Sequence, residues 1–393
     1  MPRIIPQYQV DDQLKYLYRN RKGKRIYKPI YEAYNENFFT ALVEKTEIKA
    51  TFTAFKDTAI YERYILNAVQ FSAAKSVTAA KLIQSEVYDD NKNVRPFTEF
   101  KKKAEQVAET INDNWLRVEY ESARRQCVAS EQYRRMYEDR DLYPYWQYRG
   151  RMDAREREDH KKMEGLIFRI GDPEGDKMIP PNGWNCRCEP ESVDDDYLIE
   201  NSLKPAGPDQ LKENLKENVN EQFRHNPTAG ILPKTGSYFE LMPNANYGSP
   251  EMFGLPDPKS KKKLDGLHAT FAAKGVHQLA NQVDEWKEQY HVNKDGDVVF
   301  QNTKTFSNVL FTAKSLHTIQ KHARGFENIP DAVSNPNEIW NYWDDAEKQQ
   351  KSVRNYIIFG SVSYVVQTVA GEITDAFAVN DRSINKYRKG VIL

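Results

Sequence analysis

The chain has little cysteine, no long apolar run and no excess of charge of either sign. Its 393 residues include three cysteines, and both its lysines plus arginines and its aspartates plus glutamates total 57. Three cysteines are too few for the disulfide framework of a small secreted domain, and a net charge of zero gives no overall attraction to nucleic acid. We therefore expect reduced thiols, and we expect any DNA or RNA contact to come from a local patch.

The composition also argues against a membrane protein. The mean hydropathy is −0.80 and 29% of the residues are charged. No apolar run approaches the roughly 20 residues that a membrane span requires, and the N-terminus lacks the hydrophobic core of a signal peptide. We expect a soluble chain with no membrane span that is not exported by the usual route.

The most basic local patch lies near the N-terminus, from Lys15 to Arg25. Its tyrosines are interleaved with cations, a combination that can stack on bases and neutralise phosphates. The same run could dock on an acidic protein surface or remain a solvated arm. All three roles stay open at this point.

The length predicts two to three domains. Residues from about 30 to 84 and from about 98 to 140 carry apolar residues at helical spacing, which predicts a helical bundle with Cys127 as a small core residue. The aromatic cluster at 143–148 predicts a short strand. Prolines and glycines recur through residues 225–263 and predict an extended connector.

The last part of the chain, residues 264–393, opens with amphipathic helix patterns and ends in alternating apolar segments. These segments, with a Gly-Glu hairpin turn at 371–372, predict an antiparallel sheet of about four strands packed against helices. The predicted fold class is therefore a multidomain α+β protein. It has a mostly helical part over 1–224 with a small cysteine-containing loop and β region, then the connector, then a C-terminal α+β domain.

The stretch 153–188 contains the residues most suited to binding a metal ion. Asp153, Arg157 and His160 lie three to four positions apart, which predicts one face of a helix or helix start. Residues 180–188, Pro-Pro-Asn-Gly-Trp-Asn-Cys-Arg-Cys, cannot be helical and predict a tight loop. The two thiols of its Cys-Arg-Cys end point the same way in an extended backbone.

Zinc is the metal that this set of residues favours, because thiolate and imidazole are its preferred ligands. His160, Cys186 and Cys188 are the candidate ligands, and Asp153 or Asp159 could complete four-coordination. The two thiols could instead pack around the neighbouring tryptophan as small hydrophobic groups. A disulfide between residues only two apart would be strained.

The same stretch also has the pattern of a known family. It reads Asp153-x-Arg155-x-x-x-x-His160, then Gly165, Phe168 and the string at 180–188. This pattern resembles the phage Mu F-like minor head protein family, whose region is the phage head morphogenesis domain. Many relatives carry a further Cys pair where this chain has Arg155 to His160.

The resemblance implies a minor capsid protein of a phage or prophage, located in the head near the portal and needed for head assembly or DNA delivery. It implies portal and capsid or scaffold proteins as partners, with DNA inside the head as a further contact. The implied location is the virion, inside the capsid, and the host cytoplasm during assembly.

A second candidate site lies in the helical pattern of residues 315–324. His317, Lys321 and His322 gather imidazole and cationic groups near one face of this helix. Metal-free RNA cleavage needs a base and an acid with pKa values near neutral and a cation for the phosphorane. The same residues could also form an ordinary polar helix surface.

The sequence around this helix resembles a second family. The helix is followed by Ile329-Pro330, Asn335-Pro336, a meander of hairpin strands with Thr374 and a basic segment from Arg382 to Arg388. This order is similar to the phage-associated barnase/EndoU/colicin/RelE-like nuclease domain. The resemblance implies a toxin-like, metal-independent endoribonuclease with no cofactor, an RNA substrate and an immunity protein as a partner. The catalytic set is then His317, His322, Lys321, Thr374 and Arg382, with Lys386 as an alternative late cation.

Two other functions fit the same sequence. One is a purely structural virion protein whose C-terminal domain binds portal, scaffold or DNA without catalysis. The other is a prophage-derived toxin that is no longer built into heads. Loss of RNA cleavage on substitution of His317 or His322 would separate the first from a nuclease, and presence in assembled heads would exclude the second.

Overall fold

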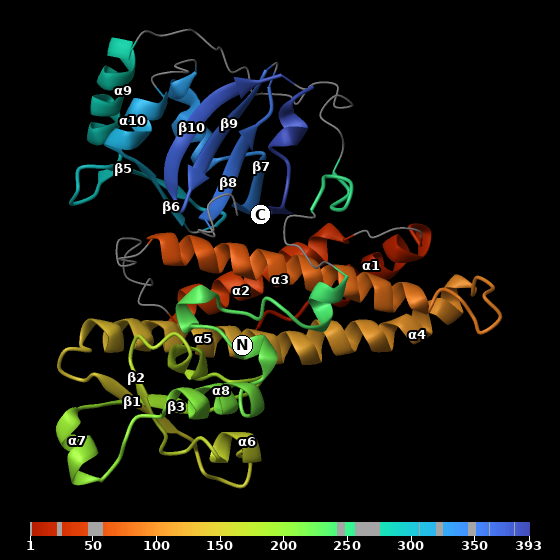
Figure 1. Cartoon of the computed structure of the whole chain (residues 1–393). Helices are drawn as coiled ribbons and strands as arrows, with labels where there is room; N and C mark the ends of the chain where they lie inside the picture. The colour runs from red at the N-terminus through yellow and green to blue at the C-terminus, as the bar shows by residue number, and fades with distance from the viewer. Residues whose placement is uncertain are drawn as a thin grey trace.

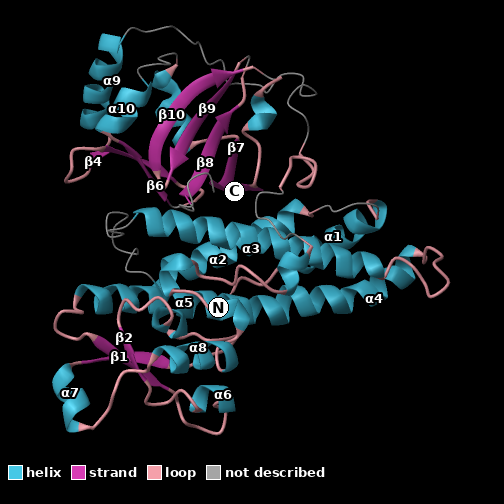
Figure 2. Cartoon of the chain, in the orientation of Figure 1, coloured by secondary structure: helices cyan, strands magenta, loops and turns pink. Residues whose placement is uncertain are grey.

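The computed structural model describes residues 2–21, 26–45, 58–241, 248–255, 276–305, 307–319, 325–344, 351–360, 362–380 and 382–393. These residues form three layers: a small β region at one end, long helices in the middle and an α+β domain at the other end (Figure 1). The strands lie in the two outer layers (Figure 2). The predicted α+β class with a helical N-terminal half is confirmed.

The middle layer is a bundle of long helices. Its elements are α1 (Gln7–Arg19), α2 (Lys28–Lys45), α3 (Thr58–Ser85), α4 (Phe97–Glu109), a π-helical segment (Thr110–Trp115) and α5 (Leu116–Glu138). Apolar residues occur on all sides of α3, and α1, α2, α4 and the C-terminal sheet cover it, so it is buried over most of its length. Cys127 is buried in α5, as predicted for a core residue.

The basic, tyrosine-rich run begins as helix α1. Leu14 and Leu17 are fully buried, and Tyr18 packs against Phe100 of α4 with 5.1 Å between the ring centroids. The first half of the run is therefore part of the bundle. Residues 22–25, which include three of its cations, lie outside the described residues.

Three short strands form the small β region. β1 (Tyr145–Arg149), β2 (Ile167–Arg169) and β3 (Glu189–Val193) pair antiparallel in the order β2-β1-β3. The helices of this region are α6 (Glu158–Lys161), α7 (Asp195–Glu200) and α8 (Pro208–Glu217). Trp146 of β1 stacks on Phe168 of β2 with 4.4 Å between ring centroids. β1 confirms the strand predicted from the aromatic cluster.

The described parts of the predicted connector pack against the helices. Ile231, Leu232 and Phe253 are each no more than 2% exposed. Asn67 of α3 accepts from the backbone N–H groups of Ile231 and Leu232 at 2.9 and 2.8 Å and donates to the Leu232 carbonyl at 3.0 Å. This stretch therefore differs from the extended spacer that its composition predicted, because its few apolar residues are buried in the core.

The third layer is an α+β domain built on one sheet. Its elements are α9 (Val276–Gln289), β4 (His291–Val292), β5 (Val298–Asn302), β6 (Ser307–Phe311), α10 (Ala313–Ile319), α11 (Ile329–Ser334), β7 (Glu338–Asp344), β8 (Lys351–Ile358), β9 (Ser363–Val369), β10 (Glu372–Val379) and β11 (Val391–Ile392). The strand order is β11-β7-β8-β9-β10-β6-β5-β4. β10 and β6 pair in parallel, and the other neighbours are antiparallel.

Within the described residues the sheet has eight strands, more than the four or so predicted. The predicted segments correspond to β8, β9, β10 and β11, whereas β4, β5, β6 and β7 were missed. The hairpin between β9 and β10 turns at Ala370-Gly371, with φ of 51° and 84°, one residue before the predicted pair. Two successive positive φ angles suit the right-handed twist of the flanking strands.

One apolar core joins the C-terminal domain to the helical bundle. Phe253 contacts Tyr31 of α2 and Trp340 of β7, with 5.2 and 5.8 Å between ring centroids. Trp343 at the end of β7 donates from Nε1 to Gln70 of α3 at 3.0 Å. Among the described helices, none combines the length and the apolar character needed to span a bilayer.

Candidate metal centre

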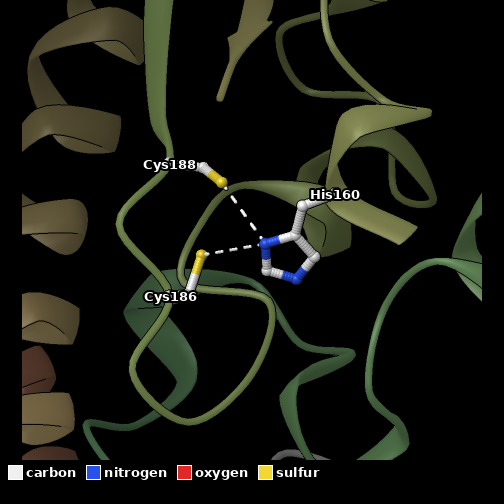
Figure 3. A group of neighbouring side chains, drawn as sticks. All are labelled: His160, Cys186 and Cys188. Atoms are coloured by element: carbon white, nitrogen blue, oxygen red, sulfur yellow. Dashed lines mark hydrogen bonds between the residues drawn. The ribbon is translucent and has the colours of Figure 1, made fainter. Parts of the chain in front are cut away.

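The loop of residues 180–188 is held from both sides by hydrogen bonds. The buried Asn182 side chain accepts from the Tyr148 hydroxyl at 3.1 Å and donates to a backbone carbonyl at 2.9 Å. Arg125 of α5 donates to the carbonyl of Cys186. With the backbone fixed in this way, both cysteine thiols face the same imidazole, as the Cys-x-Cys spacing predicted (Figure 3).

Four donor atoms meet on this side of the loop. His160 Nδ1 lies 3.6 Å from Cys186 Sγ and 3.3 Å from Cys188 Sγ. Glu156 Oε1 lies 3.4 Å from both Cys188 Sγ and His160 Nδ1. None of the four residues is more than 8% exposed. The cluster therefore offers two sulfurs and one nitrogen that all lie within 4.8 Å of one another, with the Glu156 oxygen beside the nitrogen and one sulfur.

The carboxylate nearest the cluster belongs to Glu156, which the sequence did not single out. Asp153 is exposed and accepts two hydrogen bonds from the Arg187 guanidinium, both at 2.6 Å. Asp159 accepts from the backbone N–H of His160 at 3.0 Å. Both predicted aspartates therefore have other partners, and Glu156 is a further candidate for the fourth ligand.

Glu156 reaches the cluster because the expected helix is shorter than predicted. α6 begins only at Glu158, so the prediction of a helical face from Asp153 to His160 was wrong. Glu156 precedes that helix by two residues, and its Oε2 accepts from the backbone N–H of Arg151 at 3.0 Å. That bond leaves Oε1 directed at His160. A Glu four positions before the histidine was the available sequence signal.

The ligand types and the distances around His160 match those of a zinc site. With Zn–S near 2.3 Å and Zn–N or Zn–O near 2.0–2.2 Å, neighbouring tetrahedral donors lie about 3.3–3.8 Å apart. The distances from His160 Nδ1 to the two sulfurs are 3.6 and 3.3 Å. His160, Cys186 and Cys188 therefore fit this ion, and Glu156 lies beside two of these three residues.

Arg157 fixes the proton on the free imidazole. Its Nη2 lies 2.9 Å from His160 Nε2, and a guanidinium can only donate, so Nε2 accepts and Nδ1 carries the proton in the neutral ring. A metal ion on Nδ1 takes the place of that proton and leaves it on Nε2. Two donors would then face each other, so Arg157 must turn away from the ring when metal binds.

The two thiols differ in acidity. Hydrogen bonds from Cys188 and from His160 hold the pKa of Cys186 well below its usual value, although burial acts in the opposite direction. The hydrogen bond to Cys186 and burial raise the pKa of Cys188. Cys186 is therefore the more acidic thiol of the pair, and the thiolate is the form that binds metal.

A cavity of about 380 Å³ lies between this loop and α5. Four arginines line it: Arg124, Arg125, Arg151 and Arg187. Three of them are paired with the carboxylates of Glu121, Glu189 and Asp153. The cavity wall therefore carries mixed charge.

The residues predicted to cleave RNA lie elsewhere, in the C-terminal domain. Lys321 and His322 lie outside the described residues. α10 carries the exposed His317 and packs along β10, where Ser315 Oγ donates to a β10 carbonyl at 2.6 Å. The half-buried Thr374 is in that strand and donates to the Gln367 carbonyl at 3.3 Å. His317 and Thr374 are thus on neighbouring elements.

The predicted late cations follow the end of β10 in the chain. Arg382 and Lys386 are exposed and follow the end of β10 at Val379. Thr374 lies near the start of that strand, and five extended residues span about 17 Å. After β10 the chain turns back over the sheet, because the Tyr387 ring lies 5.1 Å from the Phe377 ring of β10 and the Tyr387 carbonyl accepts from Asn355 of β8 at 2.9 Å.

Comparison with known proteins bears on both parts of the chain. Residues 70–190 match the family model of phage Mu protein F like proteins. Residues 285–393 match the model of the phage-Barnase-EndoU-ColicinE5/D-RelE like nuclease 2 family. This chain joins a phage Mu F-like region to a nuclease-family domain. Both resemblances inferred from the sequence motifs are confirmed, and Glu156, His160, Cys186 and Cys188 all lie in the matched Mu F-like region.

Two curated relatives match short segments of the chain. The putative capsid assembly protein F of Escherichia phage Mu is 42% identical over 64 residues, which are 16% of this chain and 15% of that protein. The Mu-like prophage FluMu F protein of Haemophilus influenzae is 36% identical over 77 residues, 20% of this chain and 19% of that protein. The chain thus spans less than a fifth of each relative's length in these matches. No solved structure matches the chain.

Proposed function

We propose that this chain is a minor head protein of a phage or prophage and that its nuclease-family domain cleaves RNA without a metal. The observation that carries the first part is the donor cluster within the Mu F-like region, where the motif that predicted the family forms a closed site. The name of the phage Mu relative, a putative capsid assembly protein, supports a role in head assembly. The partners are then the portal and the capsid or scaffold proteins, with DNA inside the head as a further contact.

The metal centre serves the fold in this proposal. His160, Cys186, Cys188 and Glu156 hold one zinc ion, which supplies a cross-link between the 156–160 turn and the 180–188 loop. Four protein donors leave no open position for a substrate, which is typical of structural zinc. The buried carboxylate and thiolate then have a cation as their partner.

The metal proposal is tested by measuring zinc in the chain purified without added chelator. We expect one zinc per chain, loss of zinc in a Cys186→Ser variant, and a lower melting temperature after chelation. Cys127→Ser is the control, because Cys127 is a buried thiol far along α5 with no role in the cluster. Equal zinc in all three proteins, or none in any, would contradict the proposal.

The location in the virion is tested by fractionation. Particles are purified after induction of the phage or prophage, and the chain is followed by an antibody raised against it. We expect it in DNA-filled heads at low copy number, and cross-linked to the portal protein. Complete absence from assembled heads would instead favour a prophage-derived toxin that no longer enters particles.

The catalytic claim is tested on the whole purified chain. Total RNA and tRNA are incubated with it in the presence and absence of EDTA, beside His317→Ala and His322→Ala variants. We expect cleavage that persists in EDTA and is lost in the histidine variants, because the histidines supply the base and the acid. If no RNA is cut under any condition, the domain is a structural or binding module.

A further inference from the structure

A fully buried ion pair joins the nuclease-family domain to the helical bundle. Arg354 of β8 and Glu62 of α3 are 292 positions apart in the chain. Arg354 Nη2 lies 2.5 Å from Glu62 Oε2, and Nη1 donates to Oε1 at 3.2 Å. The side chains are 0% and 1% exposed. The two charges have therefore been removed from water at the contact between the two parts.

The nuclease-family domain builds a polar pocket around this guanidinium from its own residues. Arg354 Nη1 donates to Ser307 Oγ at 2.9 Å and to the Tyr356 hydroxyl at 3.0 Å. Arg354 Nε has no hydrogen-bond partner among the described residues. Ser307 Oγ also lies 2.6 Å from the Thr305 hydroxyl. Without Glu62 the pocket would hold a cation with a free N–H beside two hydroxyl groups, but no anion.

Adhesion between the two parts does not explain this pair. Burying two charges costs solvation free energy that their attraction only roughly offsets, and apolar residues of similar size often do as well. The same contact surface already uses such residues, since Phe253 lies against Tyr31 and Trp340. A pocket that selects for an anion indicates an anionic ligand.

Carboxylate and phosphate are alternative ligands for an arginine, because both present oxygens that accept two parallel N–H bonds. We propose that Arg354, Ser307 and Tyr356 form a subsite for a backbone phosphate of RNA and that the Glu62 carboxylate occupies it. The inference rests on the proposed RNase function and adds autoinhibition to it, with Glu62 of α3 as the mask that covers the phosphate subsite. While α3 covers the pocket, RNA reaches the subsite only in the small fraction of chains in which α3 is released, so the wild type cleaves slowly and release of α3 raises the rate.

The test uses the full chain and two substitutions of Glu62. Glu62→Gln removes the negative charge with little change of shape, and Glu62→Lys opposes Arg354 with a like charge and forces the contact open. Each is assayed for RNA cleavage and for binding of a short 2′-O-methyl RNA, which cannot be cleaved because its 2′-oxygen is blocked. We expect binding and cleavage to rise by roughly tenfold or more, the effect of one charge-assisted contact.

Two further variants test whether Arg354 binds RNA phosphate or only holds the nuclease-family domain against α3. Arg354→Met opens the same contact, because it leaves Glu62 buried and unpaired, but it removes the proposed ligand. We expect the gain to be absent in Arg354→Met and abolished in Glu62→Lys/Arg354→Met. Gln70→Leu is the control, because it removes the Trp343 hydrogen bond at the same surface without touching the pocket. It should behave as wild type.

Each outcome has one meaning. If the double variant binds RNA as well as Glu62→Lys does, or if neither Glu62 variant gains binding, the phosphate subsite is overturned. If Glu62→Lys gains binding through Arg354 but no variant cuts RNA, the subsite stands and the RNase proposal fails. If wild type and both Glu62 variants cut RNA equally, the RNase stands and the mask fails. Circular dichroism of every variant shows that it is folded.

Discussion

Glu156 and Glu158 are two positions apart but face different surroundings. Glu156 is buried beside His160 and Cys188, whereas Glu158 is exposed and pairs with Lys161. Burial of a carboxylate is costly unless the group is paired or hydrogen-bonded, and Glu156 Oε1 lies 3.4 Å from both Cys188 Sγ and His160 Nδ1. The proposed zinc ion would add a cation to these partners. Glu158 is exposed to water, so its charge needs no buried partner.

We expect Glu156→Gln to weaken zinc binding by at least about tenfold, because a neutral amide oxygen replaces a charged ligand. Glu158→Gln should leave the affinity unchanged. Competition with a chromophoric chelator measures both. Equal affinity in the two variants would show that the fourth ligand is not Glu156.

Lys234 is the clearest case in which a charge opposes folding. Burial lowers its pKa from 10.5 to about 8, and the charge of Arg63 acts in the same direction. Its ammonium lies 5.2 Å from the centre of the Trp343 ring, a contact that offsets part of the cost. Between pH 8 and 10.5 the unfolded chain binds more protons than the folded one, so this residue makes stability rise with pH in that window.

We expect Lys234→Met to stabilise the chain at pH 7 by about 1–2 kcal/mol, with allowance for the water that reaches this half-buried side chain. The gain should shrink as pH rises from 8 toward 10. Thermal melts at pH 7, 8, 9 and 10 measure it, with the exposed Lys212→Met as the control. A gain that is constant across this range would show that the amine does not titrate as inferred.

At the scale of single elements, the connector segment around residues 226–241 is held by side chains of α3. Tyr64 and Thr78 each donate one hydrogen bond to its backbone, and Asn67 makes more of these bonds than either. Gly230 passes so close to Asn67 that an added Cβ would lie 2.9 Å from its Cγ and Oδ1. Asn67 makes three hydrogen bonds to the backbone of Ile231 and Leu232, so it cannot move aside without losing them. Gly207 before α8 has nothing within 4 Å.

We therefore expect Gly230→Ala to lower the free energy of unfolding by about 1–3 kcal/mol through overpacking. Gly207→Ala should be close to neutral. Chemical unfolding of the three proteins followed by fluorescence measures the difference. A Gly230→Ala variant as stable as Gly207→Ala would mean that the segment lifts from α3 at little cost.

The elements also show which features a sequence pattern can predict. Helices α2 to α5 and strand β1 were predicted because their apolar residues repeat at the period of the element, a purely local property. β7 was missed because it contains Glu338 and Asn341, both buried. Glu338 is satisfied by Arg388 at 2.7 and 2.8 Å, and Asn341 accepts from Ser352 at 3.1 Å. Those partners come from distant residues, so no local pattern marks the strand as buried.

The same distinction holds for the candidate sites. His160, Cys186 and Cys188 could be predicted because their chemistry is unusual and their spacing is short. Glu156 could not be chosen over Asp153 or Asp159, since the choice depends on where a turn ends and α6 begins. The pairing of Glu62 with Arg354 depends on how two separate parts of the chain pack, and no local pattern contains that information.

At the scale of the whole molecule, the two family regions share a single core. Phe253 is 2% exposed, and it fills the space between Tyr31 of the helical bundle and Trp340 of the sheet. An aromatic ring that contacts both parts makes the stability of each depend on the other. A chain built in this way should unfold in one cooperative transition, although it matches two unrelated families.

Phe253→Ala should remove that coupling. Truncating a buried phenylalanine costs about 3–5 kcal/mol, and here the loss falls on the contact between the two parts. We expect one calorimetric transition in the wild type and two in Phe253→Ala, with faster hydrogen exchange in β7. Leu142→Ala is the control. Leu142 is 74% exposed, so this variant should keep the single transition. If Phe253→Ala also melts in one transition, the Glu62–Arg354 pair and the remaining contacts are enough to hold the nuclease-family domain against the helical bundle. Release of that domain in the cell would then require cleavage of the chain or a partner that competes for α3.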